Sequence, residues 1–539
     1  MEIYMNPIFD VAKRGSEFLR NHFPKPGVAN SLRNQCHEQQ QCYEHQLREY
    51  SPNLQGAKGV PIAGVPSTIS DGVSNVETKF RLPNDESGIT PITPPAPPKP
   101  HSEIVGEFDG LGDGKISDWQ AGWNITNAIQ GMSLVSLPYA VLHGGYWGLA
   151  SLVFVAYICC HTGKILVDCL YEYDEKTGKI VRVRDSYVEI AQVCFGQKYG
   201  GKIINTAQVI ELLMTCILYV VLTGDLMIGT FPEGDIDLRS WMMLCSILLI
   251  PCAFLKDLQS VSTLSLWCTI IHFAINAVIF AYCFLNISDW YWDKVTFKID
   301  AATFPICLGI VVFSYTSQIF LPSLEGNMSE PARFDDMLDW SHIAAALCKT
   351  LFAWVGFLTF GDATQEVITN NLPTRGFKAL VNLTLVIKAL LSYPLPYYAA
   401  AHLLEICLFK RKPTEQEPDG EGDQPFPSMW TRDGEYRVWA VGFRVTLVMI
   451  TMFAAISIPH FALLLGFIGS FTGTMLSFVW PCYFHMYLRW NDLEMRTIVW
   501  ECFIIVLGVF FGLTGMYSSF IGLLEVGMVD VVTAGIVTT

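Results

Sequence analysis

The chain has 539 residues, of which 51% are hydrophobic and only 16% are charged. A soluble globular protein carries about 25% charged residues, so this composition argues against an ordinary soluble enzyme. The net charge of −15 excludes a general nucleic-acid binder, because neutralising phosphates requires a clustered basic surface. The sixteen cysteines form no CxxC pair and no His/Cys ligand spacing, so we expect no disulfide framework and no metal site.

The first 117 residues form a polar zone rich in Gln, Asn, Ser, Gly and Pro. The zone opens without the early apolar core of a secretory signal, so we expect the chain to enter the membrane through an internal helix. Residues 90–100 are proline-rich, which favours an extended chain without internal hydrogen bonds. Because its apolar periodicity is too weak to bury a core, residues 1–117 are predicted to form a disordered cytosolic tail.

From Trp119 onward the chain becomes a series of apolar runs, most of them near the ~20 residues that cross a bilayer as a helix. They predict an all-α membrane domain with about eleven transmembrane helices over residues 118–525, followed by a short non-cytosolic tail at 526–539. The fourth run contains Pro251 and is the shortest. The runs cover roughly 119–142, 146–170, 203–230, 240–255, 261–285, 303–325, 341–360, 379–407, 438–457, 461–488 and 497–525.

Basic residues favour one side of this predicted domain. The connections after the even-numbered runs are rich in them, for example Lys176, Lys179, Arg182, Arg184, Lys410, Arg411 and Lys412. The connections on the other side hold only Arg239, Lys294, Lys298, Arg375 and Lys378. Since cytosolic loops carry the excess of Lys and Arg, we expect a cytosolic N-terminus and a non-cytosolic C-terminus. The sequon at Asn286 then faces the non-cytosolic side, although its closeness to the fifth helix argues against glycosylation.

Two of the predicted helices contain residues that interrupt a helix. The first carries Gly131 and Pro138 with two serines between them, and the sixth carries Gly309 and Pro322 on either side of a polar stretch at 314–318. A membrane helix can lose backbone hydrogen bonds only where protein or a water-filled cavity replaces them. Helices one and six hold corresponding places in two five-helix halves, which is typical of inverted repeats that build a midplane binding site. The alternative is that Gly131 and Pro138 merely kink a packing helix.

Such interruptions suit a substrate that carries both charges. The N-terminus of a half-helix presents free N–H groups to a carboxylate, while a C-terminus and unwound carbonyls suit an ammonium group. A zwitterion fits both ends. The predicted substrate-binding residues are therefore those of the two interruptions: Gly131, Ser133, Leu134, Ser136, Ser314, Tyr315 and Gln318.

Ionisable residues inside the apolar runs are candidates for coupling transport to an ion. Lys388 could replace a free coupling cation or release a proton, and the alternative is a structural ion pair with Glu211. His272 has a suitable intrinsic pKa, although a lone histidine in an apolar helix is more often a satisfied core residue. Lys349 lies near the middle of the seventh run. Lys164, Asp168 and Arg444 lie nearer helix ends, where a short reach to water is the simpler explanation.

Several segments carry a resemblance to a known family. They are WNITNAIQGM (123–132), LPYA (137–140), HGG (143–145), VRVRDSY (181–187), FSYTSQIFLPSLEGNM (313–328) and KALLSYPLP (388–396). Across residues 119–525 the chain closely resembles members of the amino acid/auxin permease family. The resemblance implies two inverted five-helix repeats with broken helices one and six, plus one extra helix.

The resemblance also implies a function: a secondary active transporter that loads GABA and glycine from the cytosol into synaptic vesicles, driven by the proton gradient. It leaves proton exchange and chloride co-transport as alternatives. A proton-coupled amino acid carrier of the plasma membrane or lysosome is the main competing function. A channel lacks a ring-forming selectivity sequence. An enzyme has no phosphate loop, GxSxG or HExxH motif to support it, so neither catalysis nor a cofactor is expected.

Overall fold

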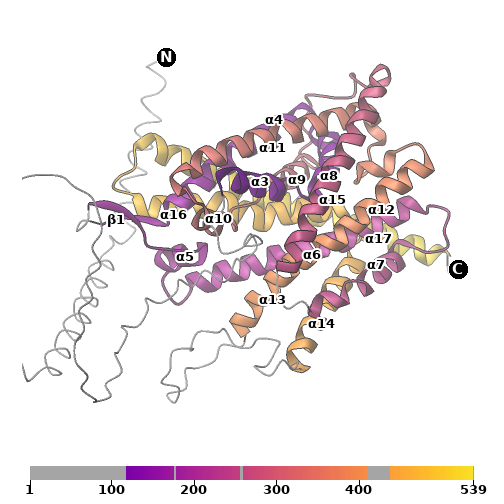
Figure 1. The fold of residues 1–539 in the computed structure, drawn as a ribbon. Coiled ribbons are helices and arrows are strands. Elements are labelled where there is room, and N and C mark those ends of the chain that lie inside the picture. Colours follow the sequence, from indigo (N-terminus) through magenta and orange to yellow (C-terminus); the bar gives the residue numbers. More distant parts are fainter. Residues whose placement is uncertain (1–116, 175–177, 255–258, 409–437, 538–539) are drawn as a thin grey trace, which may run out of the picture. The chain divides into compact units, whose positions relative to one another are not determined.

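The computed structural model describes residues 117–174, 178–254, 259–408 and 438–537. The predicted tail, apart from its last residue, lies outside these ranges. The described residues form a bundle of helices with one short two-stranded sheet (Figure 1). The α-helices of this bundle are α3 (Asp118–Ile129), α4 (Leu137–Asp168), α5 (Tyr187–Phe195), α6 (Gly200–Thr230), α7 (Leu238–Ile247), α8 (Gln259–Leu285), α9 (Phe304–Tyr315), α10 (Leu321–Asn327), α11 (Phe334–Phe360), α12 (Arg375–Ser392), α13 (Pro394–Leu408), α14 (Val438–Ser457), α15 (Phe461–Ile468), α16 (Trp480–Arg489) and α17 (Met495–Val537).

The described helices confirm an all-α membrane protein. Seven helical segments are long and apolar enough to cross a membrane, and shorter apolar helices cover 238–254, 270–285 and 304–315. The predicted total of eleven is not established by these segments. The fourth run is divided, because α7 ends at Ile247 and a 3₁₀ turn, Ile250–Phe254, contains the proline. The last helix, α17, continues to Val537 through the residues expected to form the C-terminal tail.

The first two predicted helices are joined at a single glycine. Gly145, within α4, has a φ of +53°, so the helical backbone is interrupted at this residue. The N–H of Tyr146 donates to the carbonyl of Thr296, 3.1 Å away. A Cβ at Gly145 would collide with that same carbonyl, so both the backbone conformation and the close approach require glycine.

Helices one and six are both interrupted, as predicted. Helix one is divided into α3 and the first part of α4 by a 3₁₀ turn, η2 (Met132–Ser136). Helix six is divided into α9 and α10 by five residues, 316–320, without helical structure. A simple kink at Gly131 and Pro138 is therefore wrong for helix one, because a whole turn of different structure separates its halves.

The second half of each interrupted helix begins in the same way. α4 starts with Leu137-Pro138 and α10 starts with Leu321-Pro322, so a proline occupies the first turn of each. Proline is tolerated there because the N–H groups of the first turn have no intrahelical partner. The same dipeptide restarts the helix in both halves of the domain.

α9 lies in the interior of the bundle, where it packs against α4, α15 and α17. Its residues from Pro305 to Val312 are all buried. The helix that crosses it is α15, which continues through two π-helical segments, η8 (Gly469–Gly473) and η9 (Met475–Val479), into α16. A Cβ at Gly309 would collide with the carbonyl of Gly466, and a Cβ at Gly469 would collide with the carbonyl of Gly309. Reciprocal glycines thus let two backbones touch, as at the close helix crossings of membrane proteins.

The two-stranded sheet was not predicted from the sequence. β1 (Tyr171–Asp174) pairs antiparallel with β2 (Lys179–Arg182), with Tyr171 opposite Arg182 and Glu172 opposite Val181. It lies in the connection between α4 and α5. Each strand has four residues, too few for a recognisable alternation of polar and apolar positions.

Replacing Gly309 with alanine is expected to lower the free energy of unfolding by about 1–3 kcal/mol, because the added methyl group forces α9 away from α15. The matched control is Gly442→Ala in α14, where an added Cβ meets nothing within 4 Å. Thermal unfolding of the purified variants in detergent measures the difference. Equal melting temperatures for the two variants would contradict the proposed close crossing.

Candidate functional site

The turn that interrupts helix one is closed to solvent. Ser133, Leu134 and Ser136 are buried, and Gly131, which precedes the turn, is half-buried. The hydroxyl of Ser136 donates to the backbone carbonyl of Glu366, 2.5 Å away. η2 also packs directly against α9 and α11. The interruption of helix one is therefore adjacent to α9, the helix that carries Ser314 and Tyr315.

The C-terminal end of α9 has a buried cation as its partner. Lys349 of α11 is completely buried, and its ammonium donates to the carbonyl of Ser314. The same ammonium lies 4.0 Å from the centre of the Tyr315 ring. Carbonyls at a helix C-terminus carry partial negative charge, and an aromatic face attracts a cation, so both partners suit an ammonium group.

Two hydroxyl groups near Lys349, those of Ser314 and Tyr315, differ in whether they form a hydrogen bond within the protein. The hydroxyl of Ser314 donates to the carbonyl of Val311, 2.7 Å away. The hydroxyl of Tyr315 is buried and has no hydrogen-bond partner among the described residues. A buried unpaired hydroxyl costs free energy, so it marks a place where a bound group would be stabilised.

Gln318 holds the non-helical residues of helix six to the surrounding helices. Its side-chain amide donates to Thr162 and to the carbonyl of Cys159, both in α4, at 3.2 and 3.3 Å. Its side-chain oxygen accepts from the hydroxyl of Ser477 in η9, 2.7 Å away, and from the N–H of Ser317. The structure thus engages Gln318 with protein groups, and its contact with substrate stays a prediction.

The three predicted coupling residues lie in two places. His272 of α8 donates from Nε2 to the carbonyl of Gln130, 3.0 Å away, where helix one is interrupted. Lys388 of α12 lies close enough to His272 for the charge of its ammonium to act on the imidazole. Glu211 of α6 instead accepts a hydrogen bond from Thr472 in η8. Their roles in coupling stay predictions.

A hollow of about 420 Å³ lies next to Thr472, between α6 and the π-helical segments. Most of its lining residues are apolar, and the lining also includes the polar residues Lys202, Thr206 and Thr472. It is separate from the interruptions of helices one and six, since none of their residues lines it. Apart from Thr472, its lining is Lys202, Ile203, Thr206, Ala207, Ile210, Phe471, Met475 and Trp480.

A second polar cluster was missed by the sequence reasoning. The carboxylate of Glu366, in the connection between α11 and α12, accepts a hydrogen bond from the N–H of Ala462 at 2.9 Å. Its other oxygen, Oε1, lies 3.9 Å from Nδ1 of His460. In the same connection, Asn370 donates to the carboxylate of Asp225 at 3.1 Å. Asn382 donates in turn to Asn370 at 2.9 Å. Asp225 lies inside the third apolar run, so it carries the same sequence signal as Glu211, an acidic residue within a membrane span. Glu366 lies outside every run and carries no such signal.

The sequence indicates that Lys349 is an intramembrane lysine but does not connect it with the interrupted helices. The sequence signal was the same for Lys349 and Lys388, a cation within an apolar run. The two lysines differ in their surroundings. The ammonium of Lys349 reaches the carbonyl of Ser314 at the interruption of helix six, and α11, which carries Lys349, packs against η2.

The charge state of Glu366 makes stability depend on pH. Burial raises the pKa of this carboxyl above its usual value of 4.5, and the N–H of Ala462 and His460 oppose the shift only in part. Because the folded pKa exceeds the unfolded one, the folded state loses stability as the pH rises from about 4.5 through the folded pKa. Glu366→Gln retains the acceptor for Ala462 but has no charge, so we expect it to match the wild type near pH 4.5 and to melt at a higher temperature near pH 8. A melting difference that does not change with pH would contradict this.

Comparison with known proteins adds to this geometry. The model of the family described as transmembrane amino acid transporter protein matches residues 114–525. The human vesicular inhibitory amino acid transporter is 50% identical over 438 residues, which cover 80% of this chain and 81% of that protein. The vesicular GABA transporter of Caenorhabditis elegans is 47% identical over 419 residues, covering 77% and 82%. The counterpart from Xenopus tropicalis, also a vesicular inhibitory amino acid transporter, is 46% identical over 477 residues, covering 88% and 89%. The expectation of a transporter rather than an enzyme is confirmed, and the chain belongs to the transmembrane amino acid transporter family.

Proposed function

We propose that this protein is a secondary active transporter that loads GABA and glycine from the cytosol into synaptic vesicles, driven by the proton electrochemical gradient. The observation that carries the proposal is the pair of interrupted helices in contact, with the ammonium of Lys349 buried at the end of α9. The relatives named for vesicular transport of GABA or inhibitory amino acids support the choice of substrate and membrane.

The charges around the interruptions favour recognition of the substrate carboxylate. The N-terminal ends of α4 and α10, which carry partial positive charge, lie directly after the interruptions. The carbonyl ends of α3 and α9 are already engaged by His272 and Lys349. We therefore expect the carboxylate of GABA or glycine to lie against the N-terminal ends of α4 and α10, near Lys349. The unpaired hydroxyl of Tyr315 offers a further hydrogen bond.

Lys349 does in this site what a bound coupling cation would do. A half-helix C-terminus in a membrane needs a positive partner, and in many transporters a sodium ion occupies such a position. Here a covalently attached ammonium donates to the carbonyl of Ser314. A protein cation at this point takes the place of sodium, so the proton is the proposed coupling ion.

The proton electrochemical gradient supplies enough free energy to concentrate the substrate in the vesicle. One charge moved through about 100 mV contributes about 2.3 kcal/mol, and one pH unit contributes about 1.4 kcal/mol per proton. Together, about 3.7 kcal/mol supports a concentration ratio of roughly 500 for one exchanged proton. Lys388, Glu211 and His272 are the proposed coupling residues, and co-transport of chloride is the alternative to proton exchange.

The proposed orientation places the N-terminus in the cytosol and the C-terminus in the vesicle lumen. It puts the hairpin of β1 and β2, with Lys179 and Arg182, on the cytosolic side, where basic residues accumulate. The connection between α11 and α12, which contains Glu366, then faces the acidic lumen. Asn286 also lies on the lumenal side, at the end of α8, where its side-chain amide donates to the carbonyl of Tyr282 at 2.8 Å.

Reconstitution into liposomes tests this function. With an acidic interior or an interior-positive potential, each imposed alone, we expect saturable uptake of labelled GABA and inhibition by glycine. Lys388→Ala and Glu211→Gln are expected to weaken the response to the pH gradient. Uptake that ignores both gradients, or absence of uptake by folded protein, would overturn the proposal, and unchanged coupling in both variants would remove these two residues from the mechanism.

Replacing Lys349 with glutamine is expected to reduce GABA uptake by about tenfold or more, because a charge-assisted hydrogen bond contributes about 1.5–3 kcal/mol. Lys349→Arg, which keeps the charge, should retain part of the activity. Lys202→Gln, which removes an exposed lysine of α6, is the matched control. The initial rate of uptake, normalised to folded protein, measures the effect; a wild-type rate in Lys349→Gln would exclude Lys349 from the site.

A further inference from the structure

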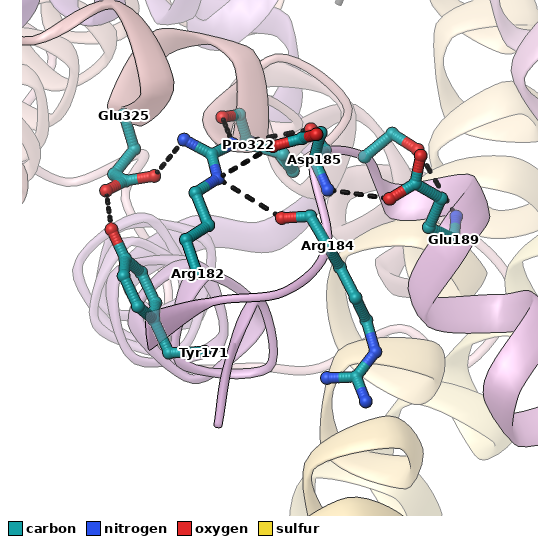
Figure 2. A network of polar contacts seen from close by, with 8 residues as sticks. Tyr171, Arg182, Arg184, Asp185, Glu189, Pro322 and Glu325 are labelled. Atoms are coloured by element: carbon teal, nitrogen blue, oxygen red, sulfur yellow. Dashed lines mark hydrogen bonds and ion pairs between the residues drawn. The ribbon is translucent and has the colours of Figure 1, made fainter. Parts of the chain in front are cut away.

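The hairpin of β1 and β2 contacts the second half of helix six. The segment VRVRDSY, which the proposed binding site does not use, forms the end of this hairpin and the loop after it. Figure 2 shows that the side chains of Tyr171 and Arg182 both point toward Glu325 of α10. Glu325 is only 1% exposed and forms an ion pair with Nη1 of Arg182 at 2.9 Å.

Arg182 binds α10 through two different groups. In addition to the ion pair with Glu325, its Nη2 donates to the carbonyl of Pro322 at 2.9 Å. Its Nε donates to the carbonyl of Arg184 at 3.1 Å, which fixes the orientation of the guanidinium from the hairpin side. A Cβ at Gly326 would lie 2.5 Å from Nη1, so glycine at that position leaves room for the guanidinium. A planar fork with several donors is suited to holding two acceptors at once.

Tyr171 completes the coordination of Glu325. Its hydroxyl donates to the second carboxylate oxygen, Oε1. Burial and the neighbouring Glu325 raise the pKa of the Tyr171 phenol above its usual value of 10.0, so the hydroxyl keeps its proton and remains a donor. Glu325 is thus held by a cation on one oxygen and by a neutral donor on the other.

The hairpin is itself fastened to parts of the domain other than α10. The N–H groups of Val183 and Arg184 donate to the carbonyl of Leu170, at the end of the α4 segment. Beyond the hairpin, the hydroxyl of Tyr187, the first residue of α5, donates to the carbonyl of Leu476 in η9 at 2.8 Å. Arg489 donates to the carbonyl of Tyr171 at 3.0 Å. Since the hairpin has these independent attachments, its contacts with α10 tie that half-helix to the ends of α4, α5 and α16.

We propose that Arg182, supported by Tyr171, is a positioning residue that holds α10 closed over the interruption of helix six and so controls access to the binding site from the hairpin side. α10 begins directly after residues 316–320, so movement of α10 away from the hairpin opens this stretch. The access that is controlled is access to the proposed amino acid site, so the inference rests on the proposed function.

The mechanism is a shift between two populations. In the closed arrangement Glu325 is buried and paired, and opening separates it from Arg182. Removing the guanidinium leaves Glu325 without its cationic partner in the closed state, whereas in the open state water can solvate the carboxylate. Loss of Arg182 therefore favours the open state and raises the fraction of molecules that admit solvent.

Cys159 reports this opening without any need for transport. It is completely buried in α4, and its carbonyl accepts the hydrogen bond from Gln318. Arg182→Ala in lipid nanodiscs should react with a water-soluble maleimide at Cys159 about tenfold faster than the wild type, measured by mass spectrometry of the Cys159 peptide. Tyr171→Phe, a milder change that keeps the ion pair, should produce a smaller increase. Lys179→Ala, which removes an exposed cation from the same strand, is the matched control and should leave the rate unchanged.

Cys245, buried in α7, distinguishes local opening from general loosening of the fold. The proposal requires that its labelling rate stay at the wild-type value in Arg182→Ala and in Tyr171→Phe. The proposal is overturned if neither variant increases the labelling rate of Cys159. It is also overturned if the labelling rate of Cys245 rises as much as that of Cys159, or if Lys179→Ala increases the labelling rate of Cys159 as much as Arg182→Ala does. Labelling of Cys159 requires no substrate. A protein that failed to transport GABA would therefore refute the proposed function, while the labelling rates would still test whether Arg182 holds α10 closed.

Discussion

The structure depends on how it satisfies backbone polar groups where two membrane helices are interrupted. No water is available in the hydrocarbon region, so every carbonyl and N–H released by an interruption needs a protein partner or a ligand. The carbonyl of Ser314 receives the ammonium of Lys349, and the carbonyl of Gln130 receives Nε2 of His272. Partners from α8 and α11 therefore stabilise α3 and α9, and the bundle has to close around both interruptions to supply them.

The second halves of the two helices are stabilised in corresponding ways. The connection between α11 and α12 binds the start of α4, where Ser136 donates to the carbonyl of Glu366. The connection between α4 and α5 binds α10 through Arg182. Both connections follow the second helix of their half of the domain, and both second halves begin with Leu-Pro. In this structure both contacts are made, and most residues of both interruptions are buried.

The interruptions could be predicted from the sequence because their causes are local. Gly131 and Pro138 in helix one, and Pro322 after a polar stretch in helix six, disfavour a continuous helix whatever surrounds them. The partners of these interruptions could not be predicted in the same way. Lys349 and Lys388 are both cations in apolar runs, and only the packing of α11 shows which one reaches Ser314. Glu366 and Arg182 lie in the connections between helices. These segments are short and polar, so they carry no periodic pattern that predicts which helix each residue contacts.

A cryo-electron microscopy map of the protein with saturating GABA tests the central claim most directly. The account predicts density for the substrate between residues 131–136 and 314–318, with its carboxylate near Lys349 and the first turns of α4 and α10. Density in the hollow beside Thr472 instead, or continuous helices through residues 130–136 and 316–320, would contradict it.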